Sequence, residues 1–242
     1  PGRPGGSLAT AVGFQPPSLL PPLAPSPTVL LTHASLLEAH PHTLEVVPAV
    51  ARSFELAADD ASLTLTLRRG LRWSDGAPFT VGDVVFTFVS VLQDEAVVEA
   101  LNAAGAGLSL PRYTVNVPDE HTVRFAFDGA SASRFLSTLA STLLLPAHLL
   151  AGAVPDGFAT AWGLETAPEA IAGLGPFRLR AVEAAPDDDG QLQLASTTVE
   201  RNPFYWKVDV NGTPLPYLDE VTVRYLPGQD LNALLLGGEL DL

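Results

Sequence analysis

The sequence predicts an α+β fold, of the mixed α/β kind, and three observations support this prediction. Short segments alternate apolar and polar residues with the period of two that is typical of a strand with one buried face, as residues 63–67 do. Residues 81–92 instead repeat apolar side chains with a helical period near 3.6. Polar turns such as residues 118–121 separate neighbouring strand patterns closely enough to form hairpins. Hairpins mixed with single helices are typical of an α+β module.

The composition indicates a folded protein that avoids polyanions. The chain has 242 residues, of which 47% are hydrophobic and 17% charged, so it can bury a large core. Its net charge of -14 disfavours binding to nucleic acid and to anionic membranes. The chain has no Cys, which excludes a disulfide framework, a thiolate metal site and a Cys nucleophile.

No apolar run in the sequence is long enough to span a bilayer, because the longest candidate, residues 137–153, is interrupted by Pro146 and His148. The chain also has no Met, not even at its start. We therefore expect it to begin after a processing site or an expression boundary, with any signal peptide or lipid-attachment Cys upstream of Pro1.

The stretch from Leu63 to Leu92 has the clearest pattern in the chain. After the strand at residues 63–67, Ser74-Asp75-Gly76 has the residue types of a tight turn. Thr80 fits a helix N-cap and Asp83 follows three residues later, which is an acidic variant of the capping box. A strand, a turn and a helix are therefore expected in this order.

The residues before this stretch predict a strand, a loop, a helix and the first arm of a hairpin. Six prolines between residues 16 and 27 preclude a helix or a central strand, so this segment is either a linker or an ordered extended loop. The hairpin pairs residues 54–56 with residues 63–67, and Val46, Val47 and Val50 are expected in the core. The expected elements are a strand at Leu8–Val12, a helix at Thr28–Ala39 and a strand at Phe54–Leu56.

The residues after Leu92 continue with short helices and hairpins up to a loop-rich stretch at residues 151–172, where we place a module boundary. Before that boundary we expect helices at 94–101, 131–140 and 146–150, a hairpin of 113–117 with 122–127, and a buried strand at 142–145. After it we expect a strand starting in residues 173–182, a return strand at 191–200, an aromatic plug at 204–206, a strand at 221–225 and a helix at Asp230–Leu236.

Four sequence blocks together resemble a known family. They are LRRGLRWSDGAPFTVGDVVFTF at residues 67–88, GLGPFRLR at 173–180, VERNPFYWK at 199–207, and PLPYLDEVTVRYLP at 214–227 followed by the closing LLLGGELDL. In this order they are similar to the signatures of the extracellular solute-binding proteins of peptide and nickel ABC importers, family 5. The resemblance covers most of the chain.

The resemblance implies a periplasmic-binding-protein-like class II fold, of which this chain is a fragment without the second lobe. Residues 1–40 and 169–242 would form part of lobe I, and residues 41–168 the extra domain that the family inserts there. The family's first loop borders its ligand cleft, so the resemblance makes Phe14 and Gln15 candidate ligand contacts. Core packing is the default expectation for Trp162, but it is the third candidate because it lies in a loop-rich stretch near the expected boundary.

The resemblance also implies a function without catalysis or a cofactor. Such a protein captures an oligopeptide or another small solute outside the membrane and delivers it to the transmembrane permease subunits of an ABC importer. Its location would be periplasmic or extracellular, with membrane anchoring possible through an upstream lipid-attachment segment. The alternative is a ligand-sensing module of a regulatory or signalling protein that uses the same fold.

The remaining chemical motifs have simpler explanations, so we assign no catalytic residue and no metal site. Gly5–Ala9 is a near miss of G-x-S-x-G, without the preceding strand that a nucleophile elbow needs. The five histidines are expected in surface loops and not at a metal site; they are His33, His40, His42, His121 and His148. The contiguous acidic residues 187–189 lack the spacing of a calcium loop and fit a solvated hairpin tip.

Overall fold

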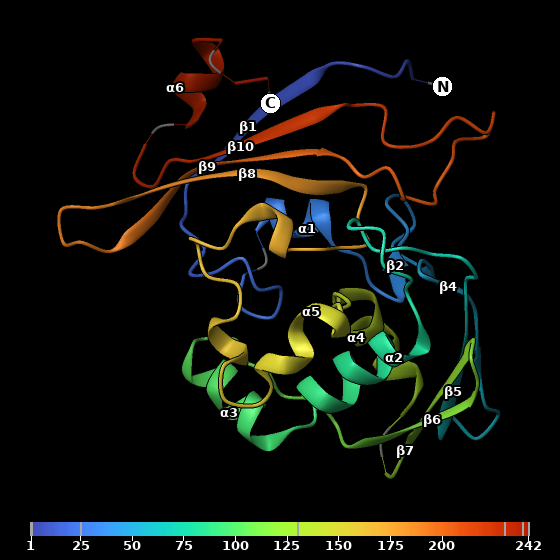
Figure 1. Cartoon of the computed structure of the whole chain (residues 1–242). Helices are drawn as coiled ribbons and strands as arrows, with labels where there is room; N and C mark the ends of the chain where they lie inside the picture. The colour runs from blue at the N-terminus through green and yellow to red at the C-terminus, as the bar shows by residue number, and fades with distance from the viewer. Residues whose placement is uncertain (1, 25, 130, 230, 239, 242) are drawn as a thin grey trace. The chain divides into compact units, whose positions relative to one another are not determined.

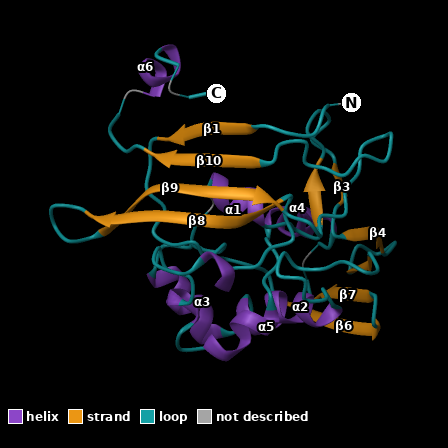
Figure 2. Cartoon of the chain, turned by 45° about the horizontal axis from the view of Figure 1, so that its top comes forward, coloured by secondary structure: helices purple, strands orange, loops and turns teal. Residues whose placement is uncertain are grey.

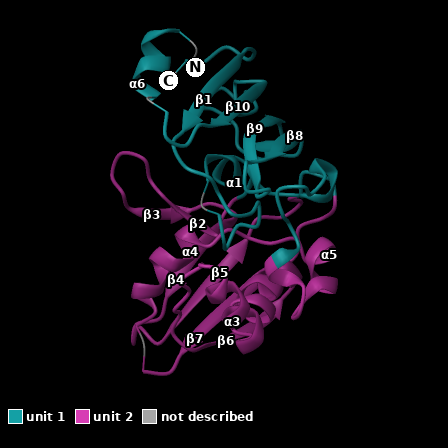
Figure 3. Ribbon diagram, turned by 90° about the vertical axis from the view of Figure 1, so that its left-hand side faces the viewer, with its two compact units in different colours: residues 1–33, 72–76, 160–242 teal, residues 34–71, 77–159 magenta. Residues whose placement is uncertain are grey.

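The structure is a computed structural model that describes residues 2–24, 26–129, 131–229, 231–238 and 240–241 (Figure 1). The chain divides into two compact units, each assembled from separate segments (Figure 3). Unit 1 contains residues 1–33, 72–76 and 160–242, and unit 2 contains residues 34–71 and 77–159. Strands and helices mix in both units, which is the α+β class that the sequence predicts.

Unit 1 is built on a four-stranded sheet of order β1-β10-β9-β8 (Figure 2). β1 runs parallel to β10, and the other neighbours are antiparallel. The helix α1 packs on β8 and β9. The elements of unit 1 are β1 (Ser7–Val12), α1 (Pro27–Thr32), η5 (Pro168–Ala170), β8 (Phe177–Pro186), β9 (Leu192–Arg201), β10 (Glu220–Tyr225) and α6 (Leu231–Leu236).

Unit 2 contains a four-stranded antiparallel sheet of order β4-β5-β7-β6 and a two-stranded sheet of β2 and β3. Its strands are β2 (Leu37–Ala39), β3 (Val46–Pro48), β4 (Ala51–Leu56), β5 (Ser62–Leu67), β6 (Tyr113–Asp119) and β7 (Thr122–Phe127). Its helical elements are α2 (Val81–Val85), η1 (Phe86–Val91), α3 (Glu95–Ala103), η2 (Ser133–Phe135), α4 (Leu136–Ser141), α5 (Ala147–Leu150) and η3 (Ala151–Ala153), and η4 (Phe158–Thr160) spans its last residues.

Most of the expected strands and hairpins are confirmed. β4 pairs with β5 and β6 with β7, and β8 with β9 forms the hairpin whose tip is residues 187–190. The alternation in β7 places Val123, Phe125 and Phe127 in the core, where Phe88 meets Phe125 edge-on with ring centroids 5.1 Å apart. Trp73 is fully buried.

The capping box at Thr80 is also confirmed. The Thr80 hydroxyl accepts from the Gly82 N–H, and the Asp83 carboxylate accepts from the Thr80 N–H at 2.8 Å. The helix that follows changes from α2 to a π-helical turn, η1, after Val85. There the Leu92 N–H donates to the Thr87 carbonyl five residues earlier, at 3.2 Å.

The prediction of one helix over Thr28–Ala39 is wrong for the second half of this segment. α1 ends at Thr32, because His33 takes an extended backbone conformation, and the Thr32 hydroxyl donates to the Thr28 carbonyl at 2.8 Å. Leu37–Ala39 instead forms β2 and pairs with β3. Strand pairing over a distance therefore overrides a helix-compatible local sequence.

Three smaller expectations also need correction. Residues 142–145 form no strand, although Leu144 and Leu145 are buried as expected. Val50 is buried, whereas Val46 and Val47 are half-buried. In the aromatic plug, Phe204 is 39% exposed while Tyr205 and Trp206 are half-buried, with their rings tilted by 55° and the ring centroids 4.8 Å apart. The helix expected at 230–236 appears as α6, and Asp230 lies outside the described residues.

Candidate functional site

The loop that follows β1, residues 13–17, is called the first loop here, and Gln15 fixes it to the sheet. The Gln15 side-chain amide donates to the Leu194 carbonyl at 2.8 Å and its oxygen accepts from the Leu194 N–H at 3.0 Å. β10 pairs with β9 only as far as Ser196, so the amide of Gln15 continues the ladder where β10 has ended. The position of the first loop is therefore set by the sheet.

Trp162 holds the segment just beyond the first loop through its backbone. Its carbonyl accepts from the Leu19 N–H at 2.9 Å and from the Ser18 hydroxyl at 2.7 Å. The Trp162 side chain is 3% exposed, and its ring centroid lies 5.9 Å from that of His33. Trp162 thus has a packing role in unit 1.

The three residues that the sequence singles out differ in what they present to solvent. Phe14 is 46% exposed. Gln15 is half-buried and uses its amide on the backbone of β9. Trp162 is buried. Phe14 is therefore the residue of the three whose side chain is free to contact a solute.

His33 is buried beside Trp162, so the expectation of a surface histidine is wrong here, and its pKa is lowered. Its Nδ1 lies 2.9 Å from the Thr32 hydroxyl, and its Nε2 has no hydrogen-bond partner among the described residues. Burial lowers the pKa of His33 from 6.5 to about 4, with a smaller opposing effect of its backbone hydrogen bond to Val29. His33 is therefore neutral at pH 7.

Residues from three of the sequence blocks meet in unit 1, at Ser74, Gly173, Gly175 and Asn202, which we call the signature junction. A Cβ atom on Gly173 would lie 1.8 Å from the Thr32 carbonyl oxygen, and one on Gly175 would lie 2.5 Å from the Leu31 carbonyl oxygen. Only glycine allows the end of α1 to approach so closely. The approach lets the Gly175 N–H donate to the Thr32 carbonyl at 2.9 Å.

Hydrogen bonds complete the signature junction. Ser74 and Gly173 exchange two of them, with the Ser74 N–H donating to the Gly173 carbonyl and the Gly173 N–H donating to the Ser74 hydroxyl at 3.1 Å. The buried Asn202 side chain donates to the Gly175 carbonyl at 2.8 Å and accepts from the Phe204 N–H at 3.0 Å. These residues have a structural role in this chain, because they join the end of α1 to the segments next to β8 and β9.

Sequence reasoning missed a buried polar cluster where α1 packs on the sheet. The hydroxyl of Thr28 makes hydrogen bonds with the hydroxyls of Thr197 and Tyr225, the latter at 2.7 Å. All three residues are buried. No sequence spacing indicates this cluster, because its members come from α1, β9 and β10.

A cavity of about 310 Å³ lies on unit 1, lined in part by Asp75, Glu169, Arg178, Arg180 and Glu200. Arg178 pairs with Glu200 at 2.6 Å, and Arg180 pairs with Glu220. Because these cations already have carboxylate partners across the strands, we assign no ligand to this cavity.

The acidic hairpin tip binds its own backbone. The Asp187 carboxylate accepts from the N–H groups of Gln191 and Asp189 and from the Gln193 side chain. The Gln191 N–H is the main cause of the lowered pKa of Asp187. Within the described residues, no cluster of three or more His, Asp or Glu side chains has the arrangement of a metal site. None of the helices in the described ranges combines the length and apolarity needed to cross a bilayer.

A model of a known protein family matches most of this chain. The model of the family "Bacterial extracellular solute-binding proteins, family 5 Middle" matches residues 45–242. The chain belongs to family 5 of the bacterial extracellular solute-binding proteins. This confirms the resemblance that the four sequence blocks indicate.

Curated relatives of this family-5 chain include transport-related binding proteins. The chain is 28% identical to the periplasmic alpha-galactoside-binding protein of Rhizobium meliloti over 86% of its length, and 27% identical to a probable ABC transporter-binding protein of Deinococcus radiodurans over 90%. A putative ABC transporter peptide-binding protein of Brucella ovis is 33% identical over 62% of the chain and 27% of its own length. The chain spans 30% and 36% of the first two relatives, about a third of their length.

Solved structures confirm the expected fold class, and this chain matches only part of the length of each of them. The periplasmic binding protein MelB of Agrobacterium fabrum, solved with stachyose, matches with a TM-score of 0.79 and 26% identity over 99% of this chain and 37% of its own. The oligopeptide-binding protein AppA of Bacillus subtilis, solved with a nonapeptide, matches with a TM-score of 0.70 and 23% identity over 98% of this chain and 44% of its own. The family-5 chain therefore has part of a periplasmic-binding-protein fold.

Proposed function

We propose that the longer protein containing this chain is the substrate-binding component of an ABC importer. It captures peptides or similar small solutes outside the membrane, in the periplasm or extracellular space, and delivers them to the permease. The family-5 match over residues 45–242 carries this proposal. Binding and release suffice for this role, and no covalent chemistry is invoked.

The division of labour within the chain is part of the proposal. Residues 1–40 and 169–242 belong to lobe I, residues 41–168 form the inserted extra domain, and the second lobe comes from the remaining length that the relatives have. A solute held between two lobes is enclosed by both, and its binding is coupled to closure of the lobes. One wall alone encloses little of a solute, so the 242-residue chain should bind it weakly.

Within lobe I, we assign solute contact to Phe14 and a positioning role to Gln15. The support is that Phe14 keeps 46% of its side chain exposed on a loop that Gln15 ties to β9. An aromatic face on a fixed backbone can stack on a sugar ring or an apolar peptide side chain without much ordering cost. Trp162 holds the segment just beyond this loop, and any contact of its ring with a solute stays a prediction.

Two solute classes need to be tested. Peptides are the first, and the Brucella ovis relative is named a putative peptide-binding protein. Oligosaccharides are the second, because the Rhizobium meliloti relative is named for alpha-galactosides and MelB was solved with stachyose, and both match most of this chain. Both classes fit an exposed aromatic side chain.

The test is native mass spectrometry of the full-length protein purified from its host, followed by calorimetric titration with the solute found. The proposal expects a co-purified peptide or oligosaccharide that binds the full-length protein in the micromolar range or tighter. The isolated 242-residue chain should bind the same solute at least about a hundredfold more weakly. A full-length protein that binds neither solute class would contradict the proposal.

A further inference from the structure

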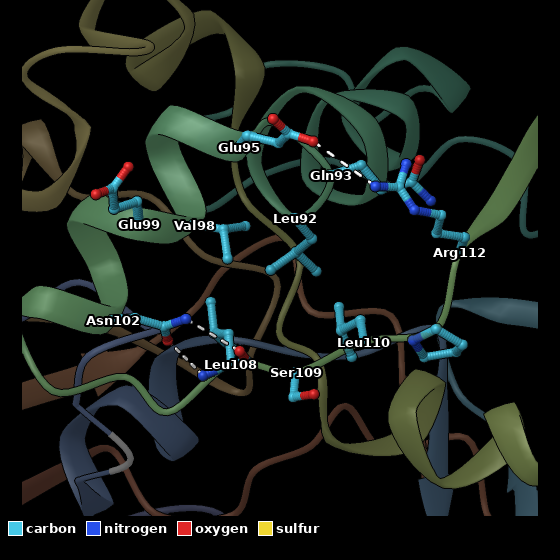
Figure 4. Close-up of a pocket in the computed structure, with 11 residues that line it drawn as sticks. Leu92, Gln93, Glu95, Val98, Glu99, Asn102, Leu108, Ser109, Leu110 and Arg112 are labelled. Carbon is cyan, nitrogen blue, oxygen red and sulfur yellow. Dashed lines mark hydrogen bonds and ion pairs between the residues drawn. The ribbon is translucent and has the colours of Figure 1, made fainter.

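Unit 2 has a groove of about 390 Å³ between α3 and the extended segment 108–112 (Figure 4). This volume is within the range of sites for small organic ligands. Apolar side chains and a polar rim both line the groove. The apolar residues are Leu92, Val98, Leu108 and Leu110, and the polar rim includes Gln93, Glu95, Glu99, Asn102 and Arg112.

Hydrogen bonds hold both walls of this groove in place. The Asn102 side chain donates to the Leu108 carbonyl at 3.0 Å and accepts from the Leu108 N–H at 2.6 Å, which ties α3 to the extended segment (Figure 4). Asp94 caps the start of α3 by accepting from the Ala96 and Val97 N–H groups. The Gln93 amide donates to the Tyr113 carbonyl at 2.8 Å. A groove fixed in this way loses little conformational freedom when it binds a ligand.

The charges on the rim favour a cation. Glu95 and Glu99 lie one helical turn apart on α3, and Arg112 is the one cation among the lining residues, all of which are described. Arg112 pairs with Glu95 at 3.7 Å, but both side chains are more than 90% exposed, so the pair is weak and readily exchanged. No cation pairs with Glu99 in the described part of the chain.

We propose that this groove binds a small organic cation, a protonated primary amine on a short apolar body. The apolar body covers Leu92, Val98 and the leucines of the segment 108–112, and the ammonium group takes the place of Arg112 beside Glu95, with Glu99 one turn further along α3 as a second carboxylate on the rim. The surplus carboxylate on the rim and the net charge of -14 disfavour an anion. All residues of this groove belong to unit 2, whereas Phe14 belongs to unit 1.

The probe is phenethylammonium chloride, added to the 242-residue chain at constant ionic strength while amide NMR shifts are recorded. Saturable shifts should concentrate in α3 and in residues 108–112. The neutral isostere phenethyl alcohol should bind at least about tenfold more weakly, because it lacks the charge that the carboxylates attract. Shifts scattered over the surface, or equal binding of the alcohol, would overturn the proposal.

Three variants locate the site. The double substitution Glu95→Gln with Glu99→Gln should raise the dissociation constant of phenethylammonium about tenfold. Glu55→Gln, which changes another exposed carboxylate, on β4, should leave it within about twofold. Arg112→Ala removes the competing cation and should tighten binding. A double variant that binds as well as the wild type, or weaker binding in Arg112→Ala, refutes the assignment.

Discussion

Two regions of unit 1 contain residues that the sequence singles out, and the two regions differ in how far those residues are exposed to solvent. At the signature junction, Ser74, Gly173, Gly175 and Asn202 are inaccessible and hydrogen-bonded to one another or to α1. In the first loop, Gln15 is bonded to the sheet while Phe14 projects an aromatic ring that is 46% exposed. The comparison teaches that residues of the sequence blocks that indicate the family build the fold of this chain, whereas the solute contact that we propose falls to a less distinctive loop.

The largest expected effect tests the close approach at the junction. Gly173→Ala places a Cβ atom 1.8 Å from the backbone oxygen of Thr32, so α1 or β8 must move. We expect the free energy of unfolding to fall by more than about 3 kcal/mol, measured by urea denaturation. Gly152→Ala is the control, because its Cβ atom meets nothing within 4 Å and its loss should stay below about 1 kcal/mol. Equal stability of the two variants would show that the junction is not tightly packed.

The next effect is a pH dependence caused by the burial of His33. The pKa of His33 is about 4 in the folded chain and 6.5 ordinarily, so between these values the unfolded chain binds more protons. The free energy of unfolding should therefore fall as the pH decreases from 6.5 to 4, by about 3 kcal/mol at most. Urea denaturation at several pH values measures this loss, which should be smaller in His33→Gln. The same slope in both proteins would exclude His33 as its cause.

Asn202→Ala should have a somewhat smaller effect at the junction. The substitution leaves the Gly175 carbonyl and the Phe204 N–H without their side-chain partner, and Asn202 is only 3% exposed. We expect a loss of about 2 kcal/mol in the free energy of unfolding. Asn211→Ala, in an exposed turn, serves as the matched control and should cost less than about 0.5 kcal/mol. If the two losses were alike, the hydrogen bonds of Asn202 would contribute nothing measurable.

The Gln15→Ala variant tests how the first loop is held, and of these variants it should change the free energy of unfolding least. It removes two partly buried hydrogen bonds to Leu194, which predicts a loss of about 1 kcal/mol. Amide hydrogen exchange of residues 13–15, the part of the first loop before Pro16 and Pro17, should become faster, because the loop is no longer held by β9. Gln191→Ala, at an exposed hairpin tip, should leave that exchange unchanged. Unchanged exchange in Gln15→Ala would mean that other contacts fix the loop.

Sequence patterns predicted the elements that rest on local chemistry. The alternation in β5 and β7 and the capping box at Thr80 each depend on a few consecutive residues, and the structure has all of them. The end of α1 at Thr32 and the pairing of β2 depend on residues far along the chain, which local periodicity does not record.

The site was predictable only in part, for the same reason. Phe14 and Gln15 are candidates because of the position of their loop in the family, and their contact with a solute stays a prediction, whereas the pairing of Gln15 with Leu194 joins residues 179 positions apart. Trp162 was ambiguous between core and surface, and its burial against His33 is a matter of tertiary packing. The hydroxyl cluster of Thr28, Thr197 and Tyr225 has no sequence signal at all.

The most direct test of the account is the Phe14→Ala variant of the full-length protein, compared with Val210→Ala, which shortens another exposed apolar side chain of unit 1. We predict that Phe14→Ala raises the dissociation constant of the co-purified solute about tenfold or more and leaves the Tm within about 1 °C. Val210→Ala should change neither quantity. An unchanged dissociation constant in Phe14→Ala would contradict the claim that the first loop contacts the solute.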